Sequence, residues 1–261
     1  MLKPFLEIYR HGNIIWATTL YDIKTKYAGS VLGYIWLFLY PVLFLTIYAA
    51  TYIMVFKVRL HMLSPYEYVL LIFCGLIPFL GFSEAVGRGT VTVTSNTDLI
   101  KNTLFPIEFM PVNIVLSSMT VPTVGFLLIL PILLYFNKLG CSSLFLPVVM
   151  FEQVIFTVGL VWILAALNVF FRDFGQVISI VLLMLMIISP IAYTEEMVPA
   201  ALRTFLYLNP LYYMIILYQK LLMFNTLDEK LFSIFTIISF GHFVLGYHFF
   251  TRLKGVFSDH V

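Results

Sequence analysis

Six stretches of the chain are rich in apolar residues and contain no Asp, Glu, Lys or Arg. They are Val31–Phe56, Tyr68–Ser83, Phe109–Asn137, Gln153–Phe171, Phe174–Thr194 and Leu231–Thr251. A helix needs about 20 apolar residues to cross roughly 30 Å of hydrocarbon, and most of these stretches are that long. The pattern therefore predicts an all-α polytopic membrane protein with six transmembrane helices.

Two of the stretches extend beyond their charge-free limits. The second is short, and its apolar pattern continues through Glu84 towards Val86, while the fourth begins near Leu144 and carries Glu152 inside it. A carboxylate near mid-membrane costs about 2.5–3.5 kcal/mol, whereas each Leu, Ile, Phe or Val returns roughly 0.3–0.6 kcal/mol. The many apolar neighbours outweigh Glu152, so we expect this stretch to insert as a helix.

A further apolar stretch, Thr204–Gln219, is short and is interrupted by Asn209-Pro210. Asn is favoured at a helix N-cap, and Pro is favoured at the first helical position because its missing N–H would have no partner there. Pro199 marks the start of another short helix upstream. We therefore predict a re-entrant or interfacial hairpin of short helices over Ser189–Phe224, placed before the last span.

The N-terminal segment has a different pattern. Over residues 3–17, Phe5, Leu6, Tyr9 and Trp16 recur near helical spacing, and the charged residues lie elsewhere. This pattern predicts an amphipathic helix along the membrane interface. Gly29 and Gly33 form a small-xxx-small pair at the start of the first span, which predicts a close helix contact.

Basic residues orient the chain, because cytoplasmic loops of membrane proteins carry an excess of Lys and Arg. With the N-terminus inside, the cytoplasmic set is Lys3, Arg10, Lys24, Lys26, Arg88, Lys101, Arg172, Arg252 and Lys254. The outer set is smaller and consists of Lys57, Arg59, Lys138, Arg203, Lys220 and Lys230. We therefore expect both termini to be cytoplasmic.

Composition agrees with a membrane protein and excludes several functions. Hydrophobic residues make up 61% of the chain and charged residues 11%, against roughly 25% charged in soluble domains. The net charge of +2 does not suggest a nucleic-acid partner. No G-x-x-x-x-G-K-[ST] phosphate loop, metal-ligand cluster or nucleophile elbow is present, so we expect no cofactor and no catalytic or metal site on this chain.

The polar interruption Gly87–Glu108 is the longest one on the predicted cytoplasmic side. Within it, Ser95-Asn96-Thr97-Asp98 resembles a capping box, and Leu99–Leu104 continues a helix that ends at Phe105-Pro106. Two interpretations remain open, an ordinary loop helix and a contact site for a cytoplasmic motor. The next cytoplasmic turn is Arg172-Asp173 alone, whose charges hold two helices at the membrane surface.

Aromatic residues are numerous, with 26 Phe, 16 Tyr and 3 Trp. Membrane interfaces collect such residues in general, but several Tyr fall within apolar stretches. A buried phenol needs a hydrogen-bond partner, and a sugar polymer offers both hydroxyls and apolar C–H faces. We therefore take the following residues as candidates for a sugar path: Trp36, Tyr40, Tyr48, Tyr135, Tyr212 and Tyr213.

Several segments together resemble the permease subunits of type-2 ABC exporters, in particular the polysaccharide branch (Wzm-, TagG- and KpsM-like). Asp22 to Trp36 resembles the family's R-D-L-K-x-R-Y-x-x-S-x-L-G-x-x-W entry, with Tyr21 and Lys26 where Arg is common. Asn96 to Pro111 is similar to its N-x-x-L-I-x-x-x-x-F-P-x-x-x-x-P loop. The later signatures are similar to Phe170–Asp173, Ser189–Tyr193, Leu208–Pro210 and the ending from Phe249 to Asp259.

The resemblance implies one transmembrane domain over residues 1–261 that forms a homodimer and pairs with two copies of a separate ATPase subunit. ATP and Mg²⁺ would be bound by that subunit. It further implies an N-terminal interface segment (1–30), a cytoplasmic coupling loop (87–112) and an external gate hairpin (189–230). The ATPase contacts would be Arg10, Asn96, Asp98, Leu99 and Lys101, and the gate residues Ser189, Pro190, Asn209 and Pro210.

The implied function is ATP-driven export of a lipid-linked polysaccharide of the O-antigen, teichoic acid or capsule type across the bacterial cytoplasmic (inner) membrane. Residues near the cytoplasmic entrance would meet a pyrophosphate-linked head group, or they would only anchor the chain by the positive-inside rule. These entry candidates are Lys24, Lys26, Arg88, Arg172 and Asp173.

Other functions remain as alternatives. A type-2 ABC permease for drugs or lipids would share the architecture and the motor and differ in substrate. A membrane-embedded glycosyl- or acyltransferase would carry a D-x-D or H-x-x-x-x-D pattern at the membrane surface, and neither occurs in the sequence. A channel or carrier without a motor would leave the cytoplasmic loop helix without a function.

Overall fold

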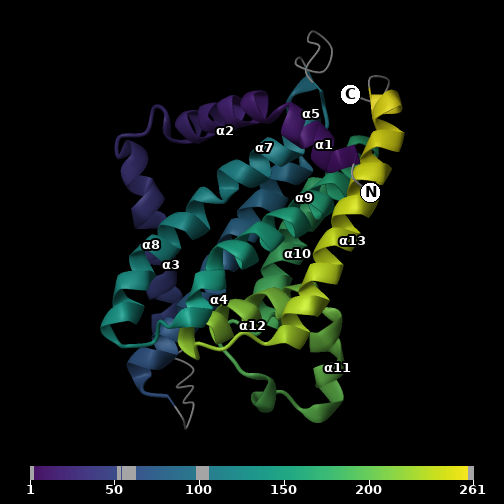
Figure 1. The fold of residues 1–261 in the computed structure, drawn as a ribbon. Coiled ribbons are helices and arrows are strands. Elements are labelled where there is room, and N and C mark those ends of the chain that lie inside the picture. The colour runs from purple at the N-terminus through teal and green to yellow at the C-terminus, as the bar shows by residue number, and fades with distance from the viewer. Residues whose placement is uncertain (1–2, 52–53, 55–62, 98–105, 258–261) are drawn as a thin grey trace.

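The computed structural model of the chain is all-helical in the residues that it describes, which are 3–51, 54, 63–97 and 106–257 (Figure 1). A short surface pair precedes a bundle of long helices. The described helices are α1 (Lys3–Arg10), α2 (Gly12–Tyr27), η1 (Gly33–Ile35), α3 (Trp36–Ala50), α4 (Pro65–Thr90), α5 (Thr92–Ser95), α7 (Phe109–Ser118), α8 (Thr120–Tyr135), η3 (Cys141–Phe145), α9 (Leu146–Phe170), α10 (Phe174–Ile188), η4 (Glu195–Met197), α11 (Ala200–Leu208), α12 (Pro210–Met223), α13 (Glu229–Leu253) and η5 (Lys254–Val256).

Five of the described helical segments are long and apolar enough to cross a membrane. They are Gly33–Ala50, Pro65–Thr90, Phe109–Tyr135, Cys141–Phe170 and Glu229–Val256. The predicted fifth span forms α10, which has only 15 residues and is shorter than the roughly 20 that a crossing helix usually needs. The bent pair α11–α12 would raise the number of candidate spans to six if it were one broken span.

The predicted short helices are confirmed as α11 and α12, a bent pair that meets at an angle of 95°. Asn209 is the N-cap of α12, where its side chain accepts a hydrogen bond from the Leu211 N–H, and Pro210 takes the first helical position. Pro199 is the N-cap of α11. The Asn-Pro step thus ends one helix and starts the next in a new direction, as the sequence predicted.

The core is built around α4 and α9, which pack against each other and against most of the other long helices. α9 and α13 approach backbone to backbone, because a Cβ added at Gly246 would lie 2.1 Å from the Gly159 carbonyl oxygen. Small residues allow this approach in the same way as in other membrane helix pairs. α3 packs mainly on α4 and α8 and leaves much of its surface exposed.

The N-terminal segment differs from the prediction in two ways. It forms two helices that break at His11, and α2 continues to Tyr27, well beyond the expected end near residue 17. Gly29 and Gly33 do not mediate a helix contact, because a Cβ at either position would have no neighbour within 4 Å. Both instead adopt positive φ values, +78° and +50°, in the turn between α2 and α3. Glycine adopts such values more readily than residues with a Cβ, so these residues shape the turn.

The loop after α4 also differs in detail. Ser95 is the last residue of α5, so it does not take the predicted N-cap position, and Asn96 follows it as the C-cap. The Asn96 side chain donates backwards to the Thr92 carbonyl oxygen at 2.8 Å. The rest of the predicted loop helix, including Asp98, Leu99 and Lys101, lies outside the described residues.

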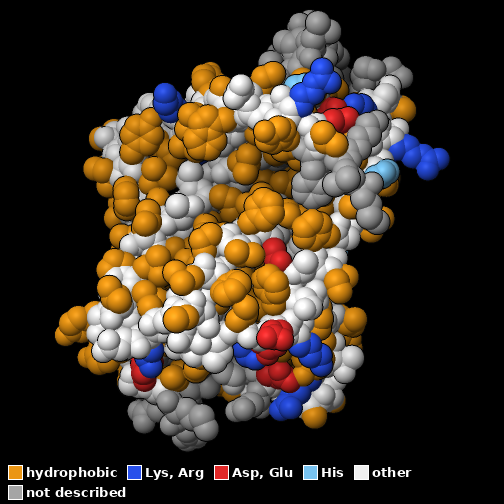
Figure 2. Space-filling view, in the orientation of Figure 1, with side chains coloured by type: hydrophobic (Ala, Val, Ile, Leu, Met, Phe, Trp, Pro, Cys, Tyr) orange, Lys and Arg blue, Asp and Glu red, His pale blue; other side chains and the backbone are white. Residues whose placement is uncertain are grey.

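Most charged side chains on the face in view gather at the two ends of the bundle, and apolar side chains predominate between them, with one acidic side chain visible near the middle (Figure 2). α1, α2, α5 and both ends of the chain lie together at one end, whereas α11 lies at the other (Figure 1). This distribution fits a protein whose middle band faces lipid and whose ends face water.

Candidate functional site

Aromatic side chains form a row along α3. The rings of Tyr40 and Phe44 stack at a centroid distance of 6.0 Å, and those of Phe44 and Tyr48 at 6.4 Å. Their spacing of four residues places them on one face of the helix. Tyr40 is 48% exposed and Trp36 is 38% exposed, so this face is only partly covered by the rest of the chain. The sequence candidates Trp36, Tyr40 and Tyr48 therefore belong to one helix.

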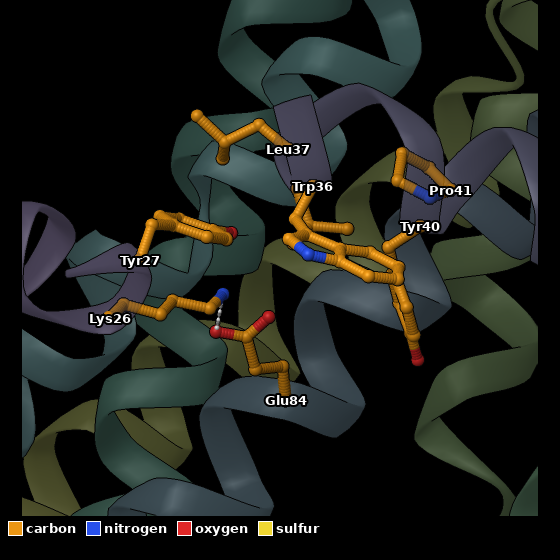
Figure 3. Close-up of a pocket in the computed structure, with 8 residues that line it drawn as sticks. Lys26, Tyr27, Trp36, Leu37, Tyr40, Pro41 and Glu84 are labelled. Carbon is orange, nitrogen blue, oxygen red and sulfur yellow. Dashed lines mark hydrogen bonds and ion pairs between the residues drawn. The ribbon is translucent and has the colours of Figure 1, made fainter. Parts of the chain in front are cut away.

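A cavity of about 180 Å³ lies beside the start of this row (Figure 3). Aromatic and aliphatic side chains form most of its wall, and a Lys–Glu ion pair contributes the charged groups. The lining residues are Lys26, Tyr27, Trp36, Leu37, Tyr40, Pro41, Glu84 and Val121. The cavity thus joins residues that the sequence placed in two separate groups, the aromatic path and the basic entry.

The two entry residues Lys26 and Arg88 are held by carboxylates. Lys26 Nζ lies 2.5 Å from Glu84 Oε1, and Arg88 donates to both carboxylate oxygens of Asp22 at 2.8 Å. Arg88 also lies 3.3 Å from Glu84 and 3.4 Å from the Ser117 hydroxyl. Two cations and two carboxylates therefore balance each other between α2 and α4. Lys24 of α2 is exposed, in contrast to these two residues.

The Arg172-Asp173 turn joins α9 to α10, as expected, and both residues are exposed. Asn168 fixes this turn to the preceding loop. Its side chain accepts from the Gly175 N–H at 3.0 Å and donates to the Thr94 hydroxyl at 2.9 Å. The turn is thereby connected to α5, which lies within the predicted coupling loop.

The predicted motor-contact residues are only partly described. Arg10 ends α1 and is exposed. α1 and the start of α2 are fixed to the bundle at two points, where Tyr247 donates to Glu7 at 2.5 Å and the His11 ring lies 5.0 Å from that of Phe109. Lys254 also pairs with Glu108 at 2.8 Å, directly before α7. These contacts join α1, α2, α7 and α13 at the end of the bundle where α5 lies.

The predicted gate residues meet in a buried contact. Asn209 donates from its side-chain nitrogen to the Ser189 hydroxyl at 3.0 Å, across 20 residues of sequence. The backbone carbonyls of Pro190 and Ile191 accept from the side chain of Gln219 at 3.3 and 3.1 Å. The segment after α10 is thus held at two points, by the N-cap residue of α12 and by Gln219 within that helix, which Pro210 opens.

The remaining aromatic candidates lie away from α3. Tyr212 is buried and donates to Glu195 at 2.9 Å, and Tyr207 donates to the same carboxylate. These two hydroxyls hold the pKa of Glu195 below its ordinary value. Tyr213 donates to the Tyr207 carbonyl oxygen, so it joins the same group, whereas Tyr135 is 82% exposed at the end of α8. The predicted aromatic path is therefore divided into three places within one chain.

Several residues of these clusters were not among the sequence candidates. Asp22 and Glu84 hold the entry cations, Glu195 ties together the tyrosines, and Gln219 holds the segment after α10. Glu84 carried a recognisable signal, since it is a carboxylate directly after the long apolar run of α4. In the described ranges, no group of three or more His, Cys, Asp or Glu could hold a metal ion.

Comparison with known proteins decides the family. Residues 14–223 match the family described as ABC-2 type transporter, which is most of the chain. The chain belongs to the ABC-2 type transporter family. It is 30% identical over 244 residues to an O-antigen export system permease protein RfbA of Klebsiella pneumoniae, covering 91% of each protein. It is 29% identical over 228 residues to the protein of the same name from Myxococcus xanthus, covering 85% of this chain and 84% of that protein.

Family membership confirms several sequence predictions. This ABC-2 permease is a transport subunit with multiple membrane-spanning helices in a bacterial membrane, and it is related to O-antigen export permeases. ABC-2 permeases pair with an ATPase subunit, which supplies the energy for transport. The residue assignments for path, entry, gate and coupling remain predictions.

Proposed function

We propose that this ABC-2 permease exports a lipid-linked polysaccharide of the O-antigen, teichoic acid or capsule type across the cytoplasmic membrane. The observation that carries the proposal is the stacked aromatic row on α3 with the adjoining cavity, in a chain similar to O-antigen export permeases over 91% of its length. Aromatic faces suit the apolar faces of sugar rings, and phenol hydroxyls bond sugar hydroxyls.

The path would run along the exposed face of α3. Trp36, Tyr40 and Tyr48 offer successive weak contacts, so the polymer can advance without being trapped at any one position. A homodimer would present two such faces and so surround the polymer with aromatic side chains. Tyr212 and Tyr213 would belong to the external gate hairpin (189–230) near the exit, together with Ser189, Pro190, Asn209 and Pro210, and Tyr135 would lie near the same side.

The entry would lie at the opposite end, near Lys24, Lys26, Arg88, Arg172 and Asp173. A pyrophosphate-linked head group would compete with Glu84 for Lys26 and with Asp22 for Arg88, because both cations are already paired. Exposed Lys24 can meet a phosphate without breaking an ion pair. Lys24 is therefore the basic residue of α2 that we expect to act first on the head group.

Coupling would occur at the end that carries both termini, which we place in the cytoplasm. Two ATPase subunits, holding ATP and Mg²⁺, would contact the interface segment (1–30) and the coupling loop (87–112). The contact residues would be Arg10, Asn96, Asp98, Leu99 and Lys101. In this arrangement α10 is the fifth of six crossings and α13 the last, and α11–α12 form a re-entrant hairpin on the outer side.

Purification of the tagged chain from its native cell tests the coupling part of the proposal. A stoichiometric ATPase subunit should co-purify in mild detergent, and ATP turnover of the complex should fall when Leu99→Asp is introduced. Thr226→Ala is a matched control, since Thr226 is exposed between α12 and α13 at the opposite end. A chain that purifies alone, with no ATPase even after crosslinking, would contradict the proposal. A complex that turns over ATP in response to a drug or a free lipid, but not to lipid-linked polysaccharide, would favour the alternative substrate class.

A further inference from the structure

Glu152 lies about two turns inside α9 and contacts Thr236 of α13. The Thr236 hydroxyl oxygen is 2.6 Å from Glu152 Oε1 and 2.9 Å from the Phe232 carbonyl oxygen, one turn earlier in α13. A threonine hydroxyl has a single hydrogen, and a backbone carbonyl can only accept. If Thr236 donates to Phe232, the hydrogen in the shorter contact has to come from the carboxyl group of Glu152.

The surroundings of Glu152 provide no charge to balance an ionised carboxylate. Its side chain is only 4% exposed, and Oε2 has no hydrogen-bond partner among the described residues. None of the described Lys, Arg or His side chains forms an ion pair with it. A buried carboxylate without a cation is strongly disfavoured inside a membrane, so the neutral acid is the form that fits this position.

Tyr218 and Gln153, two polar neighbours of Glu152, donate their hydrogens to other acceptors. Tyr218 of α12, the titratable group that interacts electrostatically with Glu152, donates its hydroxyl hydrogen to Gln153 Oε1 at 2.7 Å. Gln153 in turn donates to the Pro78 carbonyl oxygen of α4 at 2.9 Å. These bonds use the donor hydrogens of Tyr218 and Gln153. Within the described residues, Thr236 is the one neighbour that is hydrogen-bonded to Glu152.

We infer that Glu152 is a proton-binding site inside the membrane, protonated at neutral pH, and that it donates this proton to Thr236. Thr236 then donates to Phe232, which gives a continuous hydrogen-bond chain from α9 into α13. These hydrogen bonds lie about two helical turns from Gly159, where the same two helices meet backbone to backbone. Glu152 is therefore a neutral link between α9 and α13 and does not contribute a charge to the transport path. The inference is independent of the substrate proposed above.

Infrared difference spectroscopy of the full chain at pH 7 tests the proton directly. A protonated carboxyl group has a C=O stretching band that is separate from the carboxylate bands and shifts when the protein is transferred to D₂O. We expect such a band in the wild type, its loss in Glu152→Gln, and its persistence in Glu229→Gln, which removes an exposed carboxyl group at the start of α13. A wild-type spectrum without the band, or a band that Glu152→Gln leaves in place, would overturn the inference.

A second variant keeps the test decisive if Glu152→Gln does not fold. Thr236→Val is close in shape and removes the acceptor of the proposed hydrogen bond. The carboxyl band should move to higher frequency in this variant, because the O–H loses its partner and the C=O bond strengthens. An unchanged band frequency in Thr236→Val would show that Glu152 does not donate to Thr236 and would overturn the inference.

Discussion

Asn209 donates a hydrogen bond to Ser189 at 3.0 Å and also caps α12, so one side chain fixes both the start of that helix and the segment after α10. Both residues are buried, with exposed fractions of 8% and 1%. The motif residues Ser189 and Asn209, far apart in sequence, therefore act as one structural unit at the 95° bend between α11 and α12.

Replacing Asn209 should destabilise the protein more than replacing Ser189. Asn209→Ala removes the N-cap and the bond to Ser189, for a loss of about 1–3 kcal/mol. Ser189→Ala removes only the shared bond and should cost about 0.5–1.5 kcal/mol. Thermal unfolding in detergent measures both, and the double variant should cost less than the sum of the two single ones. Equal effects of the single variants would contradict a capping role for Asn209.

Shortening the aromatic row on α3 should slow export without unfolding the protein. Each lost ring contact is worth about 0.5–1.5 kcal/mol, which corresponds to roughly a 2- to 12-fold lower rate for Tyr40→Leu or Tyr48→Leu. Phe151→Leu is the matched control, because Phe151 is an exposed aromatic residue of α9 outside the proposed path. Polysaccharide at the cell surface is the readout. Equal export by the control and both tyrosine variants would remove the α3 row from the path.

Lys24 and Lys26 should respond differently to the same substitution. Lys26→Gln breaks the pair with Glu84, so it should lower the unfolding temperature as well as export. Lys24→Gln changes an exposed side chain, so it should leave the unfolding temperature unchanged and reduce export only if Lys24 meets the head group. Normal export by Lys24→Gln, at normal membrane insertion, would leave positive-inside anchoring as its role.

Glu195 should make the α11–α12 segment sensitive to acid. The Tyr207 and Tyr212 hydroxyls lower its pKa in the folded protein below the unfolded value of about 4.3. A group with a lowered pKa stabilises the fold above the unfolded value and loses this contribution as pH falls through the folded pKa. The unfolding-temperature difference between wild type and Glu195→Gln should thus be constant near neutral pH and shrink below about pH 4.3. A difference that grows on acidification would contradict this interpretation.

Local sequence signals predicted much of this fold, because they act within a few residues. Asn209-Pro210 indicated a helix start, which is present. Arg172-Asp173 indicated a two-residue connection, and the structure has a short connection that also includes Phe171. Gly29 and Gly33 misled the prediction because small-residue spacing does not distinguish a packing face from a turn with positive φ. The turn between α2 and α3 requires positive φ values at both glycines, and this requirement is not visible in the sequence pattern.

The grouping of side chains in space could not be predicted from the sequence, because it depends on how each helix is rotated about its axis. Lys26 meets Glu84 across 58 residues, and the pairing of Arg88 with Asp22 spans 66. Likewise, Tyr40 and Tyr212 are both tyrosines within apolar stretches. Tyr40 nevertheless lies on an exposed face of α3, whereas Tyr212 is buried against Glu195. The residue types were thus predictable, and their partners were not.

Removal of this gene from its native cell, with polysaccharide measured on both sides of the membrane, tests the central claim most directly. The account predicts that surface polysaccharide is lost, that lipid-linked polymer accumulates inside the cell, and that the wild-type chain restores export. Undiminished surface polysaccharide with no internal accumulation would contradict polysaccharide export as the function of this ABC-2 permease.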